Sequence, residues 1–181
     1  MVLTENLIEG LRQGDEKAQK SFYELTKTML YGLCLRYMRL PQAAEDQLIE
    51  TYLHIFKNIQ SFKNEGSFEG WIKRITVNTC LMSLRKEKMW LEISDIDDHK
   101  EQDLDPSALD HIQYEELITL MQSLPIGYRT ILNLYAIEGY KHREIADLLG
   151  ISINTSKSQL IQARKKMIEL ITLQEKSGTH G

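Results

Sequence analysis

The chain has 181 residues, of which 42% are hydrophobic and 27% are charged, and its net charge is −4. That length allows one compact domain or two small ones, and the composition excludes a disordered or fibrous chain. Charged residues interrupt every apolar run before it reaches the roughly 18 residues that a membrane span needs. The first residues lack the basic start and long apolar segment of a secretory signal. We therefore expect a soluble, cytoplasmic protein.

The first half of the chain is expected to be helical, because its apolar residues recur at spacings of three and four and no convincing alternating strand pattern is present. Polar residues that cap helices and glycine or proline breakers divide this half into segments. The expected segments are a helix over Thr4–Arg12 capped by Thr4, a helix over Glu16–Arg39 capped by Asp15, a third helix to about Lys57, a polar loop over Gln60–Phe68, and a helix capped by Ser67 that runs to about Lys88. The inward stripe of the second helix is expected to be Phe22, Leu25, Met29, Leu33 and Tyr37.

Residues 89–112 have a different composition, with eight acidic residues against one lysine, which is a net charge of −7. Few apolar residues remain to be buried there, so this stretch is predicted to be an extended, mobile linker between two domains. If fully extended, about 20 residues would span roughly 66 Å, which is nearly two turns of DNA at about 34 Å each.

The chain beyond the linker is expected to form four helical segments, followed by a disordered tail over residues 176–181. Short helices separated by a glycine-containing turn, the second of them long, are typical of a helix-turn-helix. The expected helices are Tyr114–Ser123, Tyr128–Ile137, His142–Leu149 and Asn154–Leu173.

The last of these helices carries polar and basic residues opposite its apolar stripe. Between Lys141 and Glu169 there are six Lys or Arg residues against three Asp or Glu residues, an excess suited to a polyanion. Ser158 and Gln162 can hydrogen-bond to base edges, and Ile161 can contact a thymine methyl group. A solvated amphipathic helix in a bundle is the alternative, but the preceding glycine turn and the basic face together favour DNA binding. The basic residues able to pair with phosphates are Lys157, Arg164 and Lys165.

A second basic group lies on the helix before the linker, where Arg74, Asn78 and Arg85 share a face by their spacing of four and seven. Aromatic residues stand just before them, and basic residues interleaved with aromatic ones suit single-stranded nucleic acid. For Phe68 and Trp71, plain core packing is the favoured alternative. The polar loop residues lack such an explanation and are the better candidates for contacts: Lys63 and Asn64.

Other chemistry is not indicated. Cys34 and Cys80 are the only cysteines, too few for a disulfide framework or a four-ligand zinc site, and are expected to be small buried side chains. No calcium loop, phosphate-binding glycine loop or nucleophile motif is present. The sequence predicts neither a metal site nor a cofactor, and we expect no enzymatic activity.

The order of several segments is similar to that of bacterial RNA polymerase sigma factors of the sigma-70 family, extracytoplasmic-function (ECF) class. Region 2 of that family resembles AAEDQLIETYLHIF, SFEGWIKRITVN and LRK, and region 4 resembles LPIGYRTILNLYAIEGYKHREIADLLGISINTSKSQL. The resemblance covers about Glu16 to Leu170. It implies an all-α fold of two helical domains, with region 2 over residues 1–88, a flexible acidic linker over 89–112, and a helix-turn-helix region 4 over 113–175.

The resemblance also implies which residues act. The −10 promoter element would be recognised and opened by Phe62, Lys63, Asn64, Ser67, Trp71, Arg74, Asn78 and Arg85. The helix from Asn154 would lie in the major groove of the −35 element, with Lys157, Ser158, Ile161 and Gln162 as its readers and with Arg143 and Arg164 on phosphates. The full set of implied −35 contacts is Arg143, Asn154, Thr155, Lys157, Ser158, Ile161, Gln162, Arg164 and Lys165. Core polymerase would be bound by Glu45, Asp46, Glu50 and His54 on the third helix.

The implied partners are promoter DNA, the clamp helices of the largest polymerase subunit, the flap of the second-largest subunit, and an anti-sigma factor. The sequence departs from the family pattern at four positions. Gln47 stands where an aliphatic residue is usual, Ile49 where glutamine is usual, Ser156 where valine or a similar residue is common, and Gln159 where arginine often occurs.

Three alternatives remain open. A free-standing helix-turn-helix regulator would form a tight dimer on palindromic sites, whereas a sigma factor forms a one-to-one complex with polymerase on asymmetric sites. A helical protein-interaction module would leave the basic face over Lys157–Lys165 unexplained. A nucleic-acid enzyme would need an acid, base or metal cluster that the sequence does not offer.

Overall fold

The computed structural model describes residues 3–86 and 114–178, which divide into two compact units. Unit 1 lies within Met1–Glu87 and unit 2 within Lys88–Gly181. The described residues of both units form helices and turns without a strand, which confirms the all-α prediction of two helical domains. The predicted linker over residues 89–112 lies outside the described residues. None of the helices in the described ranges is both long and apolar enough to cross a bilayer.

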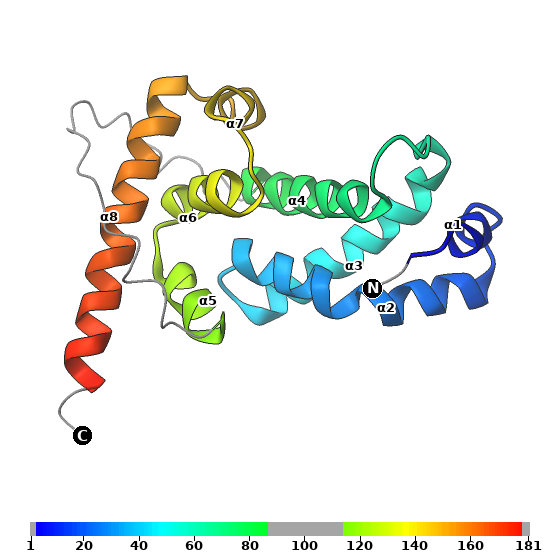
Figure 1. The fold of residues 1–181 in the computed structure, drawn as a ribbon, viewed down its shortest axis with the longest axis horizontal. Helices are drawn as coiled ribbons and strands as arrows, with labels where there is room; N and C mark the ends of the chain where they lie inside the picture. The colour runs from blue at the N-terminus through cyan, green and yellow to red at the C-terminus, as the bar shows by residue number, and fades with distance from the viewer. Residues whose placement is uncertain (1–2, 87–113, 179–181) are drawn as a thin grey trace. The chain divides into compact units, whose positions relative to one another are not determined.

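Unit 1 is a helical bundle in which α2 contacts both α3 and α4, and α3 contacts α4. In Figure 1, α1 lies beside the N-terminal end of α2. The elements are α1 (Glu5–Arg12), α2 (Glu16–Tyr37), α3 (Pro41–Asn58), the 3₁₀ turn η1 (Ile59–Ser61) and α4 (Phe68–Lys86).

Polar side chains start three of these helices, as predicted. The Thr4 hydroxyl accepts a hydrogen bond from the amide of Leu7 at 3.4 Å. The Asp15 carboxylate accepts one from the amide of Ala18 at 2.8 Å. At the start of α4, the Ser67 hydroxyl accepts a hydrogen bond from the amide of Gly70 at 3.3 Å. Each cap satisfies an N–H group that has no partner within the first helical turn.

The core of unit 1 is aromatic at its centre, where Phe22 is fully buried. The Phe22 ring lies 5.8 Å from that of Tyr52, 5.9 Å from that of Phe68 and 6.1 Å from that of Phe56, measured between centroids. The Tyr52 hydroxyl lies 2.8 Å from that of Thr26, so both polar groups are satisfied inside the core. Burial raises the pKa of Tyr52 to about 12.

The buried side of α2 differs from the predicted stripe. Leu25 is 48% exposed, whereas Thr26, one residue and about 100° further round the helix, is buried. Thr26 is tolerated there because its hydroxyl also donates to the main-chain oxygen of Phe22 at 2.7 Å. Cys34 and Cys80 are free and buried in the same unit, which confirms the prediction for the cysteines.

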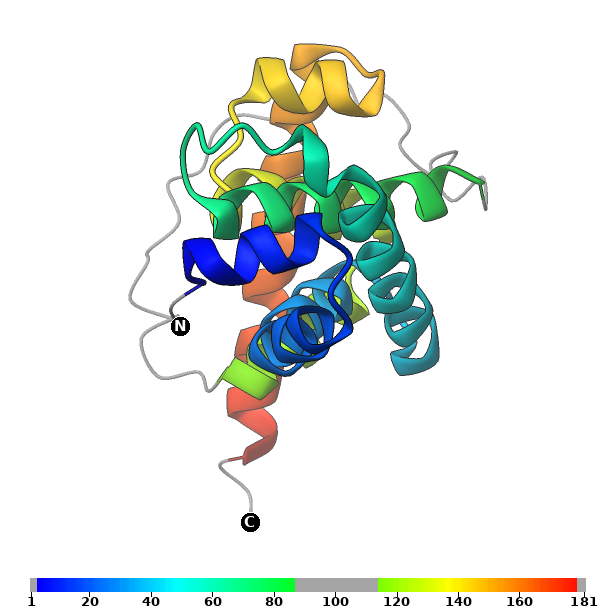
Figure 2. The ribbon, with the colours of Figure 1, turned by 90° about the vertical axis from the view of Figure 1, so that its right-hand side faces the viewer.

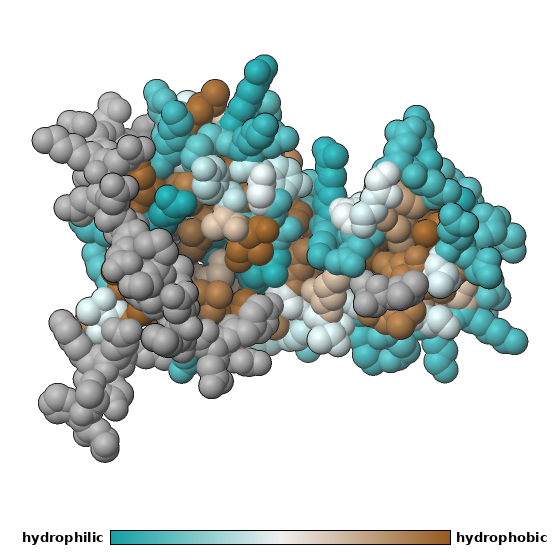
Figure 3. All heavy atoms as spheres, viewed as in Figure 1, coloured by the Kyte–Doolittle hydropathy of each residue, from teal (hydrophilic) through white to brown (hydrophobic). Residues whose placement is uncertain are grey.

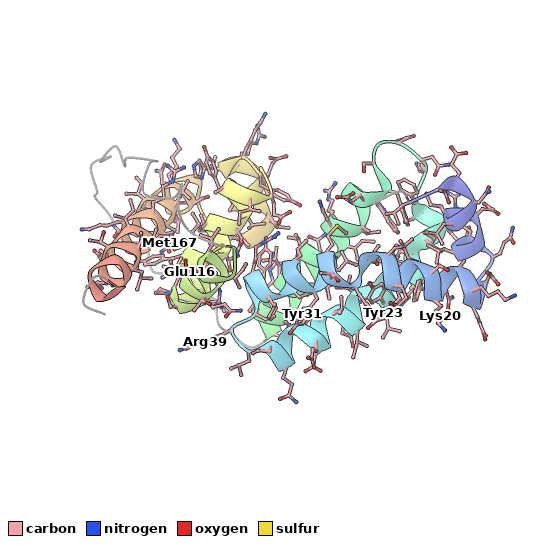
Figure 4. All side chains as sticks on the ribbon, turned by 60° about the horizontal axis from the view of Figure 1, so that its bottom comes forward. Lys20, Tyr23, Tyr31, Arg39, Glu116 and Met167 are labelled. Atoms are coloured by element: carbon pink, nitrogen blue, oxygen red, sulfur yellow. The ribbon has the colours of Figure 1, made fainter. Side chains whose placement is uncertain are left out.

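Unit 2 is organised around α8, which contacts α5, α6 and α7. Its core consists of Leu120, Met121 and Leu124 packed against Met167 and Ile171 of α8. Met167 on α8 and Glu116 on α5 are labelled in Figure 4. Figure 2 shows α7 crossing α8 near the N-terminal end of α8. The elements are α5 (Tyr114–Ser123), α6 (Ile126–Leu132), the π-helical turn η4 (Asn133–Ile137), α7 (His142–Leu149) and α8 (Ile153–Gly178).

The helix expected over Tyr128–Ile137 starts earlier, at Ile126, and changes to a wider turn at η4. The amide of Glu138 bonds to the main-chain oxygen of Asn133, five residues back, at 2.9 Å. The last helix, α8, continues to Gly178 and so enters the segment that was expected to be disordered from residue 176. Residues 153–177 contain no glycine or proline, so the backbone can continue the helix to Gly178.

Candidate nucleic-acid interface

The helix-turn-helix consists of α7, the turn at Gly150–Ser152 and α8. Gly150 has a φ of +69°, a left-handed conformation that glycine adopts without strain. Its amide bonds to the main-chain oxygen of Ala146 at 2.8 Å, and the amide of Ile151 bonds to the same oxygen at 3.1 Å. These bonds satisfy a carbonyl at the end of α7 and redirect the chain into α8.

The first turns of α8 separate a buried side from an accessible one. Leu160 and Ala163 are buried, as are the polar residues Ser156 and Gln159. The other side carries residues predicted to contact the −35 element. Three of them are half-buried, namely Ser158, Ile161 and Gln162. Four are exposed, namely Asn154, Lys157, Arg164 and Lys165. Arg143, at the start of α7, is exposed as well. These residues therefore lie on α8, except for Arg143, which lies on α7.

Thr155 does not belong to this accessible set. Its side chain is only 5% exposed, and its hydroxyl lies 2.8 Å from that of Ser152. Ser152 also accepts a hydrogen bond from the amide of Thr155 at 2.9 Å. The Thr155 side chain is therefore part of the turn, and its predicted contact with DNA stays a prediction. Its neighbour Ser158 donates its hydroxyl proton to the main-chain oxygen of Thr155 at 3.1 Å, so the Ser158 oxygen is left to accept hydrogen bonds.

A polar contact joins α7 to α8 beneath this surface. Nδ1 of His142 lies 2.9 Å from the hydroxyl oxygen of Ser156. The imidazole stacks on the ring of Tyr135 with centroids 4.5 Å apart, and the Arg164 guanidinium lies 5.8 Å from the centroid of Tyr135. Burial, followed by the charges of Lys157 and Arg164, lowers the pKa of His142. Neither His142 nor Tyr135 is among the residues predicted from the sequence, and the polar residue at position 156 is the signal that could have indicated a partner for His142.

The predicted −10 residues lie on α4 and on the loop that joins it to η1, in unit 1. Lys63, Asn64 and Ser67 are exposed in that loop, and Figure 3 shows hydrophilic side chains along this edge of the molecule. On α4, Arg74 and Arg85 are exposed and Asn78 is half-buried. Because the neighbouring Lys73 pairs with Glu69 at 2.6 Å, the pKa of Glu69 is lowered and the Lys73 charge is compensated locally.

Phe62 is not an accessible stacking surface. It is 5% exposed, and its ring lies 5.0 Å from that of Phe68 and 5.4 Å from that of Trp71. Phe68 and Trp71 are stacked, with centroids 5.6 Å apart and planes inclined by 17°. Phe62 therefore supports the loop from below, and only the half-buried Trp71 retains accessible ring surface in this cluster. The predicted contact of Phe62 with the −10 element stays a prediction.

The exposed face of α3 combines carboxylates with apolar side chains. Glu45, Asp46 and Glu50 are exposed, as predicted. Between and beyond them Ile49 is 60% exposed and Leu53 is 55% exposed. Neither Ile49 nor Leu53 is among the predicted contact residues, although the helical spacing of three and four places both beside the carboxylates.

His54 is directed away from that face. Its Nδ1 lies 2.9 Å from the Thr79 hydroxyl on α4, and the side chain is half-buried. The ring therefore contributes to the packing of α3 against α4, and its predicted role in binding polymerase stays a prediction. In the described part of the chain, His, Cys, Asp and Glu side chains form no cluster of three or more that could hold a metal ion.

Taken by itself, each unit is a helical domain, and the second is a helix-turn-helix. Residues 22–89 match the family described as Sigma-70 region 2, and residues 114–167 match Sigma-70, region 4. The chain therefore belongs to the sigma-70 family of RNA polymerase sigma factors, within its ECF class.

Individual relatives agree with this family. The chain is similar to the ECF RNA polymerase sigma factor SigE of Mycolicibacterium smegmatis, with 31% identity over 162 residues, which cover 85% of this chain and 63% of that protein. It is also similar to the RNA polymerase sigma factor SigV of Bacillus subtilis, with 29% identity over 151 residues, which cover 83% of this chain and 89% of that protein.

The fold is similar to that of a solved sigma factor, RpoE of Bartonella quintana in complex with the anti-sigma factor NepR. The TM-score is 0.54 at 20% sequence identity, and the match covers 84% of this chain and 96% of that chain.

Proposed function

We propose that this sigma factor is a transcription initiation factor that binds core RNA polymerase and directs it to promoters by reading a −10 and a −35 element. It has no catalytic activity of its own and acts with polymerase in the cytoplasm. The observation that carries the proposal is the accessible basic and polar side of α8, the second helix of a helix-turn-helix, in a chain whose other unit has its own basic face.

The −35 element is read by α8 in the major groove. Ser158 offers an acceptor and Gln162 an amide to base edges, and Ile161 offers an apolar contact to a thymine methyl group. Phosphates on either side of the groove are contacted by the exposed cations Arg143, Lys157, Arg164 and Lys165. Asn154, exposed at the start of α8, lies at the end of the helix that enters the groove.

The −10 element is opened and held by unit 1. Lys63, Asn64 and Ser67 surround a base turned out of the stack, and Trp71 offers ring surface beside them. The strand then follows α4 past Arg74, Asn78 and Arg85. A flipped base needs polar partners and a planar neighbour, and the exposed polar loop residues together with the half-buried Trp71 offer both kinds of side chain.

Core polymerase is bound by the exposed face of α3, through the clamp helices of the largest subunit. Ile49 and Leu53 provide the apolar centre of that contact, and Glu45, Asp46 and Glu50 surround it with charge. Unit 2 docks on the flap of the second-largest subunit. Residues 1–88 and 113–175 act as regions 2 and 4, and residues 89–112 tether them, so that weak contacts to separate elements add through a high effective concentration.

Regulation is by an anti-sigma factor that binds the protein and keeps it from polymerase. The solved relative RpoE is bound to such a partner, NepR.

Run-off transcription with purified core polymerase and a promoter with both elements tests the proposal. We expect transcripts only when this protein and both elements are present. A free-standing dimeric regulator would instead bind a palindromic site tightly without polymerase, and that result together with no run-off product would contradict the proposal.

A further inference from the structure

The loop between η1 and α4 is held by a helix that is distant in the sequence. Nη2 of Arg12, the last residue of α1, donates to the main-chain oxygen of Phe62 at 2.7 Å and to Oδ1 of Asn64 at 3.2 Å. In return, the side-chain amide of Gln60 donates to the main-chain oxygen of Arg12 at 2.7 Å. A single arginine therefore fixes both the backbone and a side chain of this loop.

Arg12 is itself held in place by the packing of α1. Ile8 and Leu11 are buried, and a Cβ atom at Gly10 would lie 2.7 Å from that of Ala18, so α1 approaches α2 closely. The Arg12 side chain is only 23% exposed. Its guanidinium is therefore engaged within the protein and is not displayed for DNA phosphates.

Asn64 needs such support, because its φ of +58° is uncommon for a residue with a side chain. The bond from Arg12 also decides how its amide is turned. With Oδ1 occupied by a cationic donor, the exposed side chain presents its two N–H donors outward. Asn64 in this orientation suits an acceptor on a base.

We infer that Arg12 is a positioning residue for promoter recognition, which fixes the loop and the amide orientation of Asn64 and thereby determines the preference for one base of the −10 element. This inference depends on the proposed function of the loop. It assigns a role to α1, which lies outside residues 22–89, the part that matches region 2 of the family.

The test uses the full chain assembled with core polymerase, and a promoter series in which each −10 base is replaced in turn. For Arg12→Ala we expect the preference at one −10 position to fall roughly tenfold, while affinity for DNA without a −10 element stays unchanged. Arg12→Lys keeps the charge but not the forked donor geometry, so it should restore the preference only in part. The matched control is Glu9→Ala, which removes the 3.5 Å ion pair with Arg12 but none of the loop bonds and should leave the preference unchanged.

A second measurement separates positioning from a direct phosphate contact. If Arg12 bound phosphate, Arg12→Ala would weaken binding to every sequence and lower the salt slope of log K by about 0.9, and that result would overturn the inference. In an Asn64→Ala background, Arg12→Ala should have little further effect on base preference. Full additivity of the two changes would also overturn it.

Folding and the proposed function are checked separately. If the thermal midpoint shows that Arg12→Ala is unfolded, Gln60→Ala takes its place, and an unchanged base preference in that variant would overturn the inference. A wild-type holoenzyme that shows no preference for the promoter at all would overturn the proposed function itself. A wild-type preference that survives intact in folded Arg12→Ala would overturn only the role of Arg12.

Discussion

Nδ1 of His142 and the hydroxyl oxygen of Ser156 lie 2.9 Å apart and join the first helix of the helix-turn-helix to the second. Ser156 is fully buried. The contact between α7 and α8 therefore contains a polar pair that must remain satisfied when the helices pack. Because one member of the pair is an imidazole, we expect this packing to depend on pH.

The stability of the helix-turn-helix should fall in mild acid. The folded protein lowers the pKa of His142 below the value of 6.5 for a free imidazole, mainly through burial. Between those two pKa values the unfolded chain binds more protons, so stability is complete above about pH 6.5 and is lost as the pH falls through the folded pKa. Urea unfolding at about pH 7.5 and about pH 5.5 measures this loss.

The variant His142→Asn is the matched comparison, because its amide can replace Nδ1 but does not titrate. We expect it to lose less stability than the wild type between the two pH values. Equal losses in both proteins would show that His142 is not responsible.

Phe62→Ala should destabilise unit 1 by about 3–5 kcal/mol, because it removes a buried ring from a packed aromatic cluster. The adjacent exposed residue provides the control, and Lys63→Ala should change stability by less than about 0.5 kcal/mol. Chemical denaturation of the full chain compares the two. If Phe62→Ala unfolded at the wild-type midpoint but lost −10 binding, Phe62 would be a base-stacking residue after all.

Replacing Lys157 and Gln162 with Ala should weaken binding to the −35 element roughly tenfold or more, while affinity for core polymerase stays intact. Loss of the lysine should also lower the salt slope by about 0.9. The control is Lys166→Ala, which makes the same charge change half a helical circumference from Lys157, at a residue paired with Glu169 at 3.1 Å. If the control and the double variant lowered the affinity for the −35 element equally, the attraction between α8 and DNA would be nonspecific.

Substitutions on α3 should weaken binding to core polymerase and leave binding to the −35 element unchanged. Asp46→Ala with Glu50→Ala should slow association with core polymerase and reduce its salt dependence, and Leu53→Ala should lower the affinity by at least about fivefold, since an exposed apolar anchor is lost. Binding of the −35 element should not change. The control, Glu24→Ala, removes an exposed carboxylate from α2. Weaker DNA binding without a change in polymerase affinity would contradict the proposed division.

Helix boundaries were largely predictable, because their signals are local in the sequence. Thr4, Asp15 and Ser67 cap helices through bonds to residues three positions later, and that chemistry needs no knowledge of the fold. The glycine at position 150 likewise ends α7 as expected.

Burial was less predictable, because it depends on partners far away in the chain. Phe62, a residue of the polar loop, is covered by the rings of Phe68 and Trp71, and His54 is turned to α4 by a hydroxyl 25 positions away. Arg12 was not identified at all, since its acceptors are 50 and 52 positions away. Periodicity indicates which helix face is apolar but not which polar side chains find a distant partner.

The most direct test of the two-contact account measures holoenzyme affinity for promoters with neither, one or both elements scrambled, using the wild type and the Lys157→Ala, Gln162→Ala double variant. The account predicts that scrambling either element weakens wild-type binding, and that scrambling the −35 element has little further effect on the variant, which still discriminates the −10 element. If the variant lost as much affinity as the wild type when the −35 element was scrambled, α8 would not be its reader and the account would be wrong.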